Sequence, residues 1–196
     1  MLLDKIFFQN TIQNVTWMGN AEPCFEQCII DSRVTVSGST GSSATFFALQ
    51  GDRVDGHDFI MQAYEQGART FVIARAKQAK VSDLLKNHAA TCSVALVDDV
   101  YTALITLAHT WRMQFTCPVV GITGSVGKTS TKEMLASVMR LAGKNCLATA
   151  GTRNTMVSVA TTLLALRPEH DCVIAEMDIN KRGEMANLAQ MIRPTM

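Results

Sequence analysis

The sequence predicts an α/β fold in two parts: a mixed α/β amino-terminal domain over residues 1–115 and an incomplete domain with a parallel sheet over residues 116–196. Two observations support this prediction. Short apolar, β-branched runs recur along the chain and suit buried strands. In the second part, a glycine-rich segment joins one such run directly to a helical stretch, an order typical of open α/β sheets. The dipeptide Cys117-Pro118 is a plausible joint between the two parts.

The amino-terminal part contains two predicted strands and one predicted helix. The apolar runs Thr70–Ala74 and Val94–Val97 favour strands, and Val100–Met113 favours a helix. The segment Val34–Ser43 differs in composition from the rest of this part, because it is rich in serine, threonine and glycine. That composition predicts a loop or an irregular strand.

The second part opens with a predicted strand over Val119–Thr123, a tight loop and a helix that Gly143 is expected to end. Five apolar side chains of this helix fall at spacings that gather them on one side, while Lys132, Glu133 and Arg140 are expected to face water. The five apolar residues are Met134, Leu135, Val138, Met139 and Leu141.

Two more helices and a strand follow. The helices are expected over Val157–Leu166 and Gly183–Met191, and the apolar run Cys172–Ala175 between them suits a buried parallel strand. Glu176 stands at the carboxyl end of that strand. Because ligands of open α/β sheets bind beyond the carboxyl ends of the strands, we expect Glu176 and the glycine-rich loop to face one crevice.

Composition and charge exclude several classes of protein. Hydrophobic residues make up 47% of the 196 residues and the net charge is +1, so a core is expected and nucleic acid is an unfavourable partner. Polar side chains interrupt the first 14 residues, so they lack the continuous apolar core of a signal peptide. No stretch of the sequence is long and apolar enough to span a bilayer. We therefore expect a cytoplasmic protein without a transmembrane segment, and we expect it to be a monomer.

The six cysteines are expected to be reduced thiols, because they are scattered through apolar surroundings and a cytosolic protein keeps its thiols reduced. Cys24 and Cys28 lie close enough in sequence for a metal pair. No second Cys/His pair with zinc-site spacing follows them, so the simpler interpretation is preferred.

The residue types of the loop point to phosphate binding. Glycines let successive backbone N–H groups turn toward one anion, and the following helix adds its positive amino-terminal end. Lys128 supplies a charge for terminal phosphates, and Thr129 supplies a hydroxyl suited to Mg²⁺. The spacing departs from the strict Walker pattern, since Ile122 stands where the first glycine would be. The residues expected to contact the nucleotide are Gly124, Ser125, Val126, Gly127, Lys128, Thr129 and Ser130.

The alternative is that the glycines only shape a strand-to-helix turn, with Lys128 solvated at the start of the helix. A lysine in a first helical turn opposes the helix dipole, so it requires a nearby anion to be favourable. This argument favours phosphate binding.

Two separated blocks of sequence resemble one enzyme family. The segment Gly121–Met134 is similar to the ATP loop of Mur ligases, most like the branch that adds D-alanyl-D-alanine to a UDP-linked muramoyl tripeptide. Upstream, Asp31–Arg33, Phe46–Gly51 and Asp55–Phe59, together with Gly67-Ala68, match the amino-terminal domain of the same family. The resemblance covers the chain from about Asp31 onward, with both blocks in the family's order.

The resemblance implies that the amino-terminal domain holds the UDP part of the substrate, with Ser32 and Arg33 near uridine or pyrophosphate. Arg33 has the planar fork that binds a diphosphate. Without the family, a surface ion pair between Asp31 and Arg33 is the preferred interpretation. Asp55-Gly56 is a turn signature and His57 is expected to be a satisfied surface histidine, so these are interpreted as fold markers.

In the second domain, the resemblance implies that Glu176 binds magnesium together with Thr129, and that Lys128 and Glu176 are the catalytic residues. The alternative for Glu176 is an exposed acid at the end of a strand. Asn154 is the residue that keeps the family's register in a segment expected to bind substrate. The family usually has a glutamate and a glycine in this segment. Met156 cannot supply the carboxylate, and Ser158 cannot supply the backbone freedom of the glycine.

The implied reaction uses ATP and Mg²⁺ and joins D-alanyl-D-alanine to UDP-N-acetylmuramoyl-tripeptide through an acyl phosphate. The family's catalytic histidine, modified lysine and carboxyl-terminal domain have no counterpart in these residues, and Asp178 stands where a glycine is usual. We therefore expect this chain to bind nucleotide or UDP-substrate without completing ligation. Two alternatives stay open: another P-loop kinase or nucleotide hydrolase, and a non-catalytic module that binds a UDP-sugar.

Overall fold

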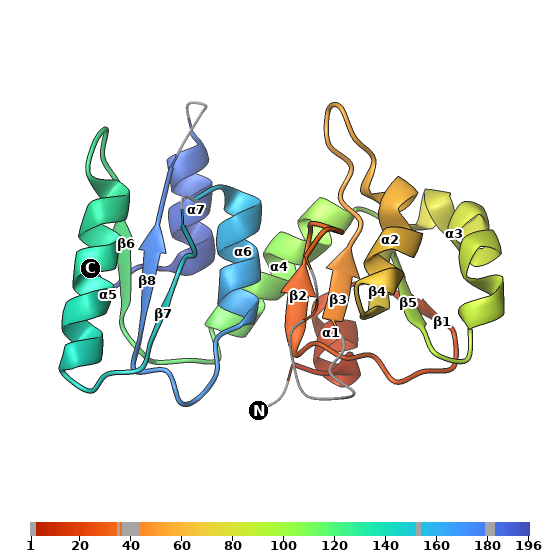
Figure 1. The fold of residues 1–196 in the computed structure, drawn as a ribbon, viewed down its shortest axis with the longest axis horizontal. Coiled ribbons are helices and arrows are strands. Elements are labelled where there is room, and N and C mark those ends of the chain that lie inside the picture. The colour runs from red at the N-terminus through yellow and green to blue at the C-terminus, as the bar shows by residue number, and fades with distance from the viewer. Residues whose placement is uncertain (1–2, 35, 37–43, 152–153, 179–182) are drawn as a thin grey trace. The chain divides into compact units, whose positions relative to one another are not determined.

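A computed structural model describes residues 3–34, 36, 44–151, 154–178 and 183–196, and it confirms the α/β fold (Figure 1). The chain forms two compact units, Met1–Leu107 and Ala108–Met196. The helix α4 (Val100–Arg112) crosses this division, since its residues from Ala108 onward belong to the second unit. Within that unit, Trp111 Nε1 donates a hydrogen bond to the carbonyl of Leu166 at 3.1 Å. The predicted boundary between residues 115 and 116 stays a prediction.

The first unit contains a five-stranded sheet in the order β1-β5-β4-β3-β2. Neighbouring strands from β2 to β5 are parallel, and β1 runs antiparallel to β5 along one edge. The strands are β1 (Thr16–Met18), β2 (Gln27–Ile29), β3 (Ala44–Phe47), β4 (Ala68–Ala74) and β5 (Ser93–Val97). The α-helices are α1 (Lys5–Thr11), α2 (Ile60–Glu65), α3 (Gln78–Leu85) and α4 (Val100–Arg112), and the 3-10 helices are η1 (Gly56–Phe59), η2 (Arg75–Lys77) and η3 (Lys86–His88).

The core of the first unit lies between this sheet and the helices that follow its strands. Phe46, Phe71 and Leu96 come from three neighbouring strands and pack in one cluster with Ile60 and Val81. Every residue of β5 is buried, as expected of a parallel strand covered on both faces. The strands and the helix predicted for this part are confirmed as β4, β5 and α4. Of the predicted loop Val34–Ser43, residues 35 and 37–43 lie outside the described residues.

The second unit contains a three-stranded parallel sheet in the order β6-β8-β7. One helix, α5, covers one face of this sheet, and α6 and α7 lie on the other side (Figure 1). The strands are β6 (Val119–Ile122), β7 (Cys146–Ala148) and β8 (Cys172–Glu176), and the helices are α5 (Lys128–Leu141), α6 (Met156–Leu164) and α7 (Glu184–Ile192). All of these elements were predicted except β7, and Gly143 ends α5 in the left-handed conformation, as expected.

The predicted buried face of α5 is wrong for three of its five apolar residues. Met134, Val138 and Leu141 are 70%, 56% and 89% exposed, whereas Lys132 is 0% exposed. The side that meets the sheet carries Lys132 and Ala136, with Leu135 and Met139 packed beside them. The prediction placed Lys132 in water together with Glu133 and Arg140. Lys132 is buried because the folded unit supplies it with polar partners, which the helical periodicity alone does not reveal.

The expectation that all six cysteines are reduced thiols is also wrong for one pair. Cys146 and Cys172 form a disulfide, with Cα atoms 4.9 Å apart. They are directly opposite each other on the neighbouring strands β7 and β8, so their side chains leave the sheet on the same face. Sequence spacing could not show this, because 26 residues separate the two positions. In the described part of the chain, no cluster of acidic, cysteine or histidine side chains has the arrangement of a metal site.

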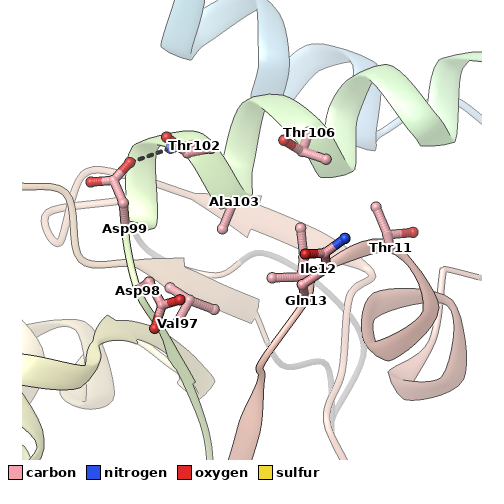
Figure 2. A pocket seen from close by; sticks show the side chains of 9 residues that line it. All are labelled: Thr11, Ile12, Gln13, Val97, Asp98, Asp99, Thr102, Ala103 and Thr106. Atoms are coloured by element: carbon pink, nitrogen blue, oxygen red, sulfur yellow. Dashed lines mark hydrogen bonds between the residues drawn. The ribbon is translucent and has the colours of Figure 1, made fainter.

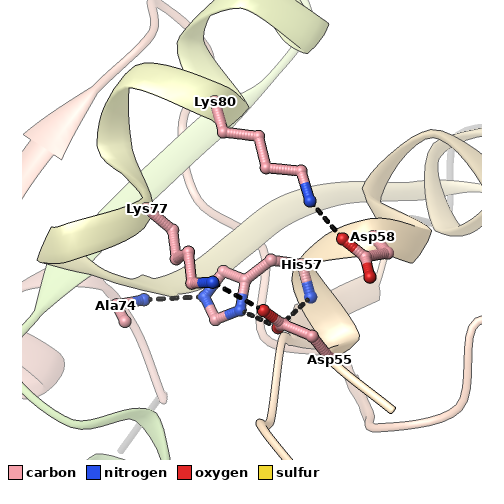
Figure 3. Close-up of polar contacts among 6 residues, drawn as sticks. All are labelled: Asp55, His57, Asp58, Ala74, Lys77 and Lys80. Carbon is pink, nitrogen blue, oxygen red and sulfur yellow. Dashed lines mark hydrogen bonds and ion pairs between the residues drawn. The ribbon is translucent and has the colours of Figure 1, made fainter.

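A buried histidine fastens η1 to the end of β4 in the first unit (Figure 3). His57 is 1% exposed, so the expectation of a surface histidine is wrong, although its hydrogen bonds are satisfied. Its Nε2 accepts from the backbone N–H of Ala74 at 3.0 Å, and its Nδ1 lies 2.5 Å from Asp55 Oδ1. Because Nε2 is an acceptor, the proton lies on Nδ1 and is donated to Asp55.

Asp55 is the centre of this group. Its Oδ2 also forms an ion pair with the ammonium of Lys77, at 2.8 Å. Burial of the carboxylate by itself raises its pKa, but the hydrogen bonds from Lys77 and His57 outweigh burial and hold the pKa of Asp55 below its ordinary value of 3.8. Its neighbour Gly56 has no room for a side chain, since a Cβ would lie 2.6 Å from the carbonyl oxygen of Leu49. These contacts agree with the interpretation of the segment as a fold marker.

We predict that Asp55→Asn destabilises the protein at neutral pH and that this effect disappears in acid. The folded state lowers the pKa of Asp55, so its contribution to stability is present above a pH of about 4 and is lost as the pH falls through the folded-state pKa. Urea unfolding between neutral and acidic pH measures the difference from wild type. The exposed neighbour Asp52 supplies the control, Asp52→Asn. A difference that is constant across the pH range would contradict the prediction.

Candidate functional site

The pairing of β6 with β8 brings the glycine-rich loop and Glu176 to the same edge of the sheet. The two strands are parallel, and Ile122, the last residue of β6, is directly opposite Glu176. The chain leaves β6 through the loop and begins α5 at Lys128. Gly127 precedes that helix with φ +83°, a left-handed conformation that a residue with a side chain rarely adopts. The predicted crevice at the carboxyl ends of the strands is therefore present.

A cavity of about 440 Å³ lies at this edge. It is lined by six residues of the loop and the first turn of α5, and by three polar residues from elsewhere in the unit. The lining residues are Ser125, Val126, Gly127, Lys128, Thr129, Ser130, Asn154, Glu176 and Asp178. Of the residues predicted to contact nucleotide, the lining lacks only Gly124.

Lys128 has an anion beside it, but that anion belongs to the protein. Its ammonium lies 3.2 Å from Asp178 Oδ1 and donates a hydrogen bond to the carbonyl of Gly124 at 2.7 Å. The charge opposition between a first-turn lysine and the helix dipole is thereby offset within the chain. Phosphate would have to replace Asp178 as the partner of this lysine.

Glu176 and Thr129 come together as the sequence predicts, and Asn154, which was expected only to bind substrate, contacts the same carboxylate. The hydroxyl of Thr129 donates to Glu176 Oε1 at 3.0 Å, and the side-chain amide of Asn154 donates to the same oxygen at 2.9 Å. Glu176 is 1% exposed, so the alternative of an exposed strand-end acid is wrong. Its backbone N–H donates to the hydroxyl of Thr149 at 3.0 Å, which fixes the end of β8.

Lys132 and Asp178 are the residues of this site to which the sequence assigned no role. The Lys132 ammonium lies 3.6 Å from Glu176 Oε2, whereas Thr129 donates to the other oxygen, Oε1. Lys132 follows Lys128 by four residues, which places both on one side of α5. That spacing was the available signal for Lys132. No sequence pattern indicated the pairing of Asp178 with Lys128.

Ser32 and Arg33 belong to the first unit. Ser32 is buried, and its hydroxyl donates to Gln62 Oε1 at 2.9 Å. Arg33 is exposed and makes two hydrogen bonds of 2.8 Å to the carboxylate of Asp31, and these raise its pKa. The surface ion pair expected from sequence alone is therefore present. Contact of Ser32 and Arg33 with a UDP group stays a prediction.

A second cavity, of about 330 Å³, lies in the first unit between the end of α1 and the start of α4 (Figure 2). Its acidic residues already have partners: Asp99 accepts a hydrogen bond from the N–H of Thr102 at 2.6 Å, and Asp98 pairs with Arg75. None of the predicted site residues lines it. We therefore identify the cavity at Lys128 and Glu176 as the candidate site.

Comparison with known families accounts for most of the chain. The model of the Mur ligase family catalytic domain matches residues 33–112, and that of the Mur ligase middle domain matches residues 122–196. The chain belongs to the Mur ligase family.

Several similar relatives of known function carry the name UDP-N-acetylmuramoyl-tripeptide--D-alanyl-D-alanine ligase. The protein from Synechocystis sp. is 40% identical over 85% of this chain and 34% of its own length. The Escherichia coli protein is 34% identical over 94% of this chain and 38% of its own length. The chain thus spans little more than a third of the length of these relatives.

Solved structures of the ligase MurF show the same fold. A crystal structure of MurF from Acinetobacter baumannii superposes with a TM-score of 0.72 at 28% identity, covering 97% of this chain and 39% of that protein. MurF from Thermotoga maritima, solved in complex with ADP, gives a TM-score of 0.61 at 25% identity over 86% of this chain and 35% of that protein.

The departures of this chain from other Mur ligases after Gly151 are partly compensated. Ser158 lies inside α6, so it does not need the backbone freedom of a glycine. Its hydroxyl and backbone N–H both bond to Thr155, which caps the helix. Met156 supplies no carboxylate, so that difference from the Mur ligase pattern remains. Residues 152 and 153 lie outside the described residues.

We predict that Asp178→Asn strengthens ATP binding measured without Mg²⁺. The substitution removes a carboxylate that competes with phosphate for Lys128. Because the side chain of Asp178 is 42% exposed, we expect a gain of about two- to fivefold, the range of an exposed ion pair. Titration calorimetry provides the measurement. The control is Asp171→Asn, which removes an acid that pairs with Lys144 outside the cavity. Weaker binding by Asp178→Asn would contradict competition.

Proposed function

We propose that this chain provides the nucleotide-binding and UDP-binding parts of an ATP-dependent ligase that joins D-alanyl-D-alanine to UDP-N-acetylmuramoyl-tripeptide. The proposal rests on one observation. The Thr129 hydroxyl donates to the Glu176 carboxylate, next to the glycine-rich loop that leads into α5. The names of the relatives support the same reaction.

The residues present fit ATP with Mg²⁺. Mg²⁺ prefers oxygen ligands at about 2.1 Å in octahedral geometry, so two adjacent ligands are separated by roughly 3.0 Å. Thr129 Oγ1 and Glu176 Oε1 are 3.0 Å apart. The glycine-rich loop and the amino-terminal end of α5 provide backbone N–H groups for the phosphates. A bound Mg²⁺ would help to neutralise the charge of the terminal phosphates.

The side chains around the cavity have separate tasks in this proposal. Lys128 would leave Asp178 and pair with the terminal phosphates, offsetting charge that develops as the γ-phosphate is transferred. Thr129 and Glu176 would orient the cation, and Asn154 would hold Glu176 in place. Lys128 and Thr129 come from the first turn of α5, and Glu176 comes from the end of β8, which gives these three side chains a rigid base.

The proposed reaction has two steps. The γ-phosphate of ATP passes to the terminal carboxylate of the tripeptide, which gives ADP and an acyl phosphate. The amine of D-alanyl-D-alanine then attacks the acyl carbon and inorganic phosphate leaves, so that an amide bond forms. Water must be excluded between the steps. The unit that contains Ser32 and Arg33 would hold the UDP group.

We further propose a cytoplasmic location, because ATP is the co-substrate of the proposed reaction. In the described part of the chain, no helix has both the length and the apolar character needed to cross a membrane. That the protein is a monomer stays a prediction.

Lys128→Ala tests the nucleotide site. We expect ATP affinity to fall roughly tenfold to a hundredfold, the value of one or two charge-assisted hydrogen bonds. Calorimetry with ATP and Mg²⁺ gives the measurement, and Lys144→Ala, an exposed lysine outside the cavity, gives the matched control. Unchanged affinity would favour the alternative of a non-catalytic UDP-sugar module. Competition of bound ATP by a simple kinase substrate would favour a P-loop kinase.

Arg33→Ala tests the substrate-binding unit. We expect the affinity for UDP to fall roughly tenfold, because the guanidinium fork pairs with a diphosphate. Arg33→Lys should recover only part of the loss, since an ammonium lacks the fork. Arg53→Ala replaces another exposed arginine of the same unit and serves as the control. If UDP binding is the same in all these variants, the contact with Asp31 is the whole role of Arg33.

A further inference from the structure

Lys132 is completely buried, although a lysine is among the residues least often found without solvent contact. A buried ammonium is tolerated only where it is paired and hydrogen-bonded. The proposed mechanism gives Lys132 no task, so its burial beside the cavity requires an explanation.

Among the residues that the structure describes, the ammonium of Lys132 has three partners. It donates to the carbonyl oxygen of Gly151, and it forms ion pairs with Glu133 Oε1 at 3.0 Å and Glu176 Oε2 at 3.6 Å. Glu133 is largely exposed, so water screens that pair. The other two partners are more informative, because Gly151 lies in the segment before Asn154 and Glu176 is the proposed metal ligand.

The two carboxylate oxygens of Glu176 have different surroundings. Oε1 accepts hydrogen bonds from Thr129 and Asn154, which both line the cavity. Oε2 is buried and has no hydrogen-bond partner among the described residues. In that same part of the chain, Lys132 provides the only ion pair recorded for this carboxylate. Lys132 therefore compensates the charge of the oxygen that has no hydrogen bond.

We propose that Lys132 is a positioning residue for the magnesium site. By attracting Oε2, it fixes the carboxylate so that Oε1 stays beside the Thr129 hydroxyl, where the cation would bind. It also donates to the carbonyl of Gly151, three residues before Asn154, which donates to Oε1. This inference rests on the proposed function, since it assigns a role within that site.

The experiment compares ATP binding with Mg²⁺ and ATP binding with EDTA for each variant of this chain. Lys132→Met keeps an unbranched side chain of similar length and removes the charge. We expect the Mg²⁺-dependent gain in affinity to fall about tenfold, as for other groups that support a metal ligand. Affinity in EDTA should stay at the wild-type value, because the phosphate loop is intact. Lys132→Arg should restore part of the gain.

Two comparisons separate positioning from a structural role. Glu133→Gln removes only the exposed partner of Lys132, so it should keep the full Mg²⁺-dependent gain. A structural role would lower the melting temperature of Lys132→Met and leave that gain intact, which would overturn the inference. If Lys132→Met does not fold, Lys132→Gln is judged by the same criterion. Absence of ATP binding by the wild type, with or without Mg²⁺, would instead refute the proposed function.

Discussion

The parallel pairing of β6 with β8 is the constraint on which the candidate site depends. It places the last residue of β6 opposite Glu176, so the loop that leaves one strand and the acid that ends the other share an edge. A slip of one residue would turn Glu176 to the opposite face of the sheet, because side chains alternate along a strand. The contact between Thr129 and Glu176 is therefore a consequence of register, and the helix that begins at Lys128 is fixed by the same pairing.

The charged side chains that this pairing brings to the cavity form ion pairs with other residues of the same unit. Lys128 pairs with Asp178, and the buried Glu176 pairs with Lys132. Each charge of the cavity is thus compensated before any ligand binds. Phosphate binding is then an exchange of partners at Lys128, and its free energy is a difference between two ion pairs. A metal ion would similarly replace the hydrogen bond between Thr129 and Glu176, whereas the ion pair between Glu176 and Lys132 would remain.

Sequence reasoning predicted what depends on local spacing. The loop, the helix after it and the strand that ends at Glu176 are contiguous patterns, and all are confirmed. It failed where a residue depends on partners far away in the chain. Lys132 is buried because of Gly151 and Glu176, and His57 is buried because of the end of β4. The disulfide between β7 and β8 likewise requires their register, which no spacing rule supplies.

The two blocks that revealed the family differ in what they can prove. In the first unit, Gly56 packs against the backbone of Leu49 and His57 binds the end of β4, so those matching residues are required by packing. Their presence indicates a fold, whatever the unit binds. In the second unit, Lys128 is held by an acid that phosphate could replace, and packing alone does not require a lysine there. The resemblance of the loop that contains Lys128 therefore points to a ligand, so the nucleotide site supports a functional proposal more directly than the UDP site does.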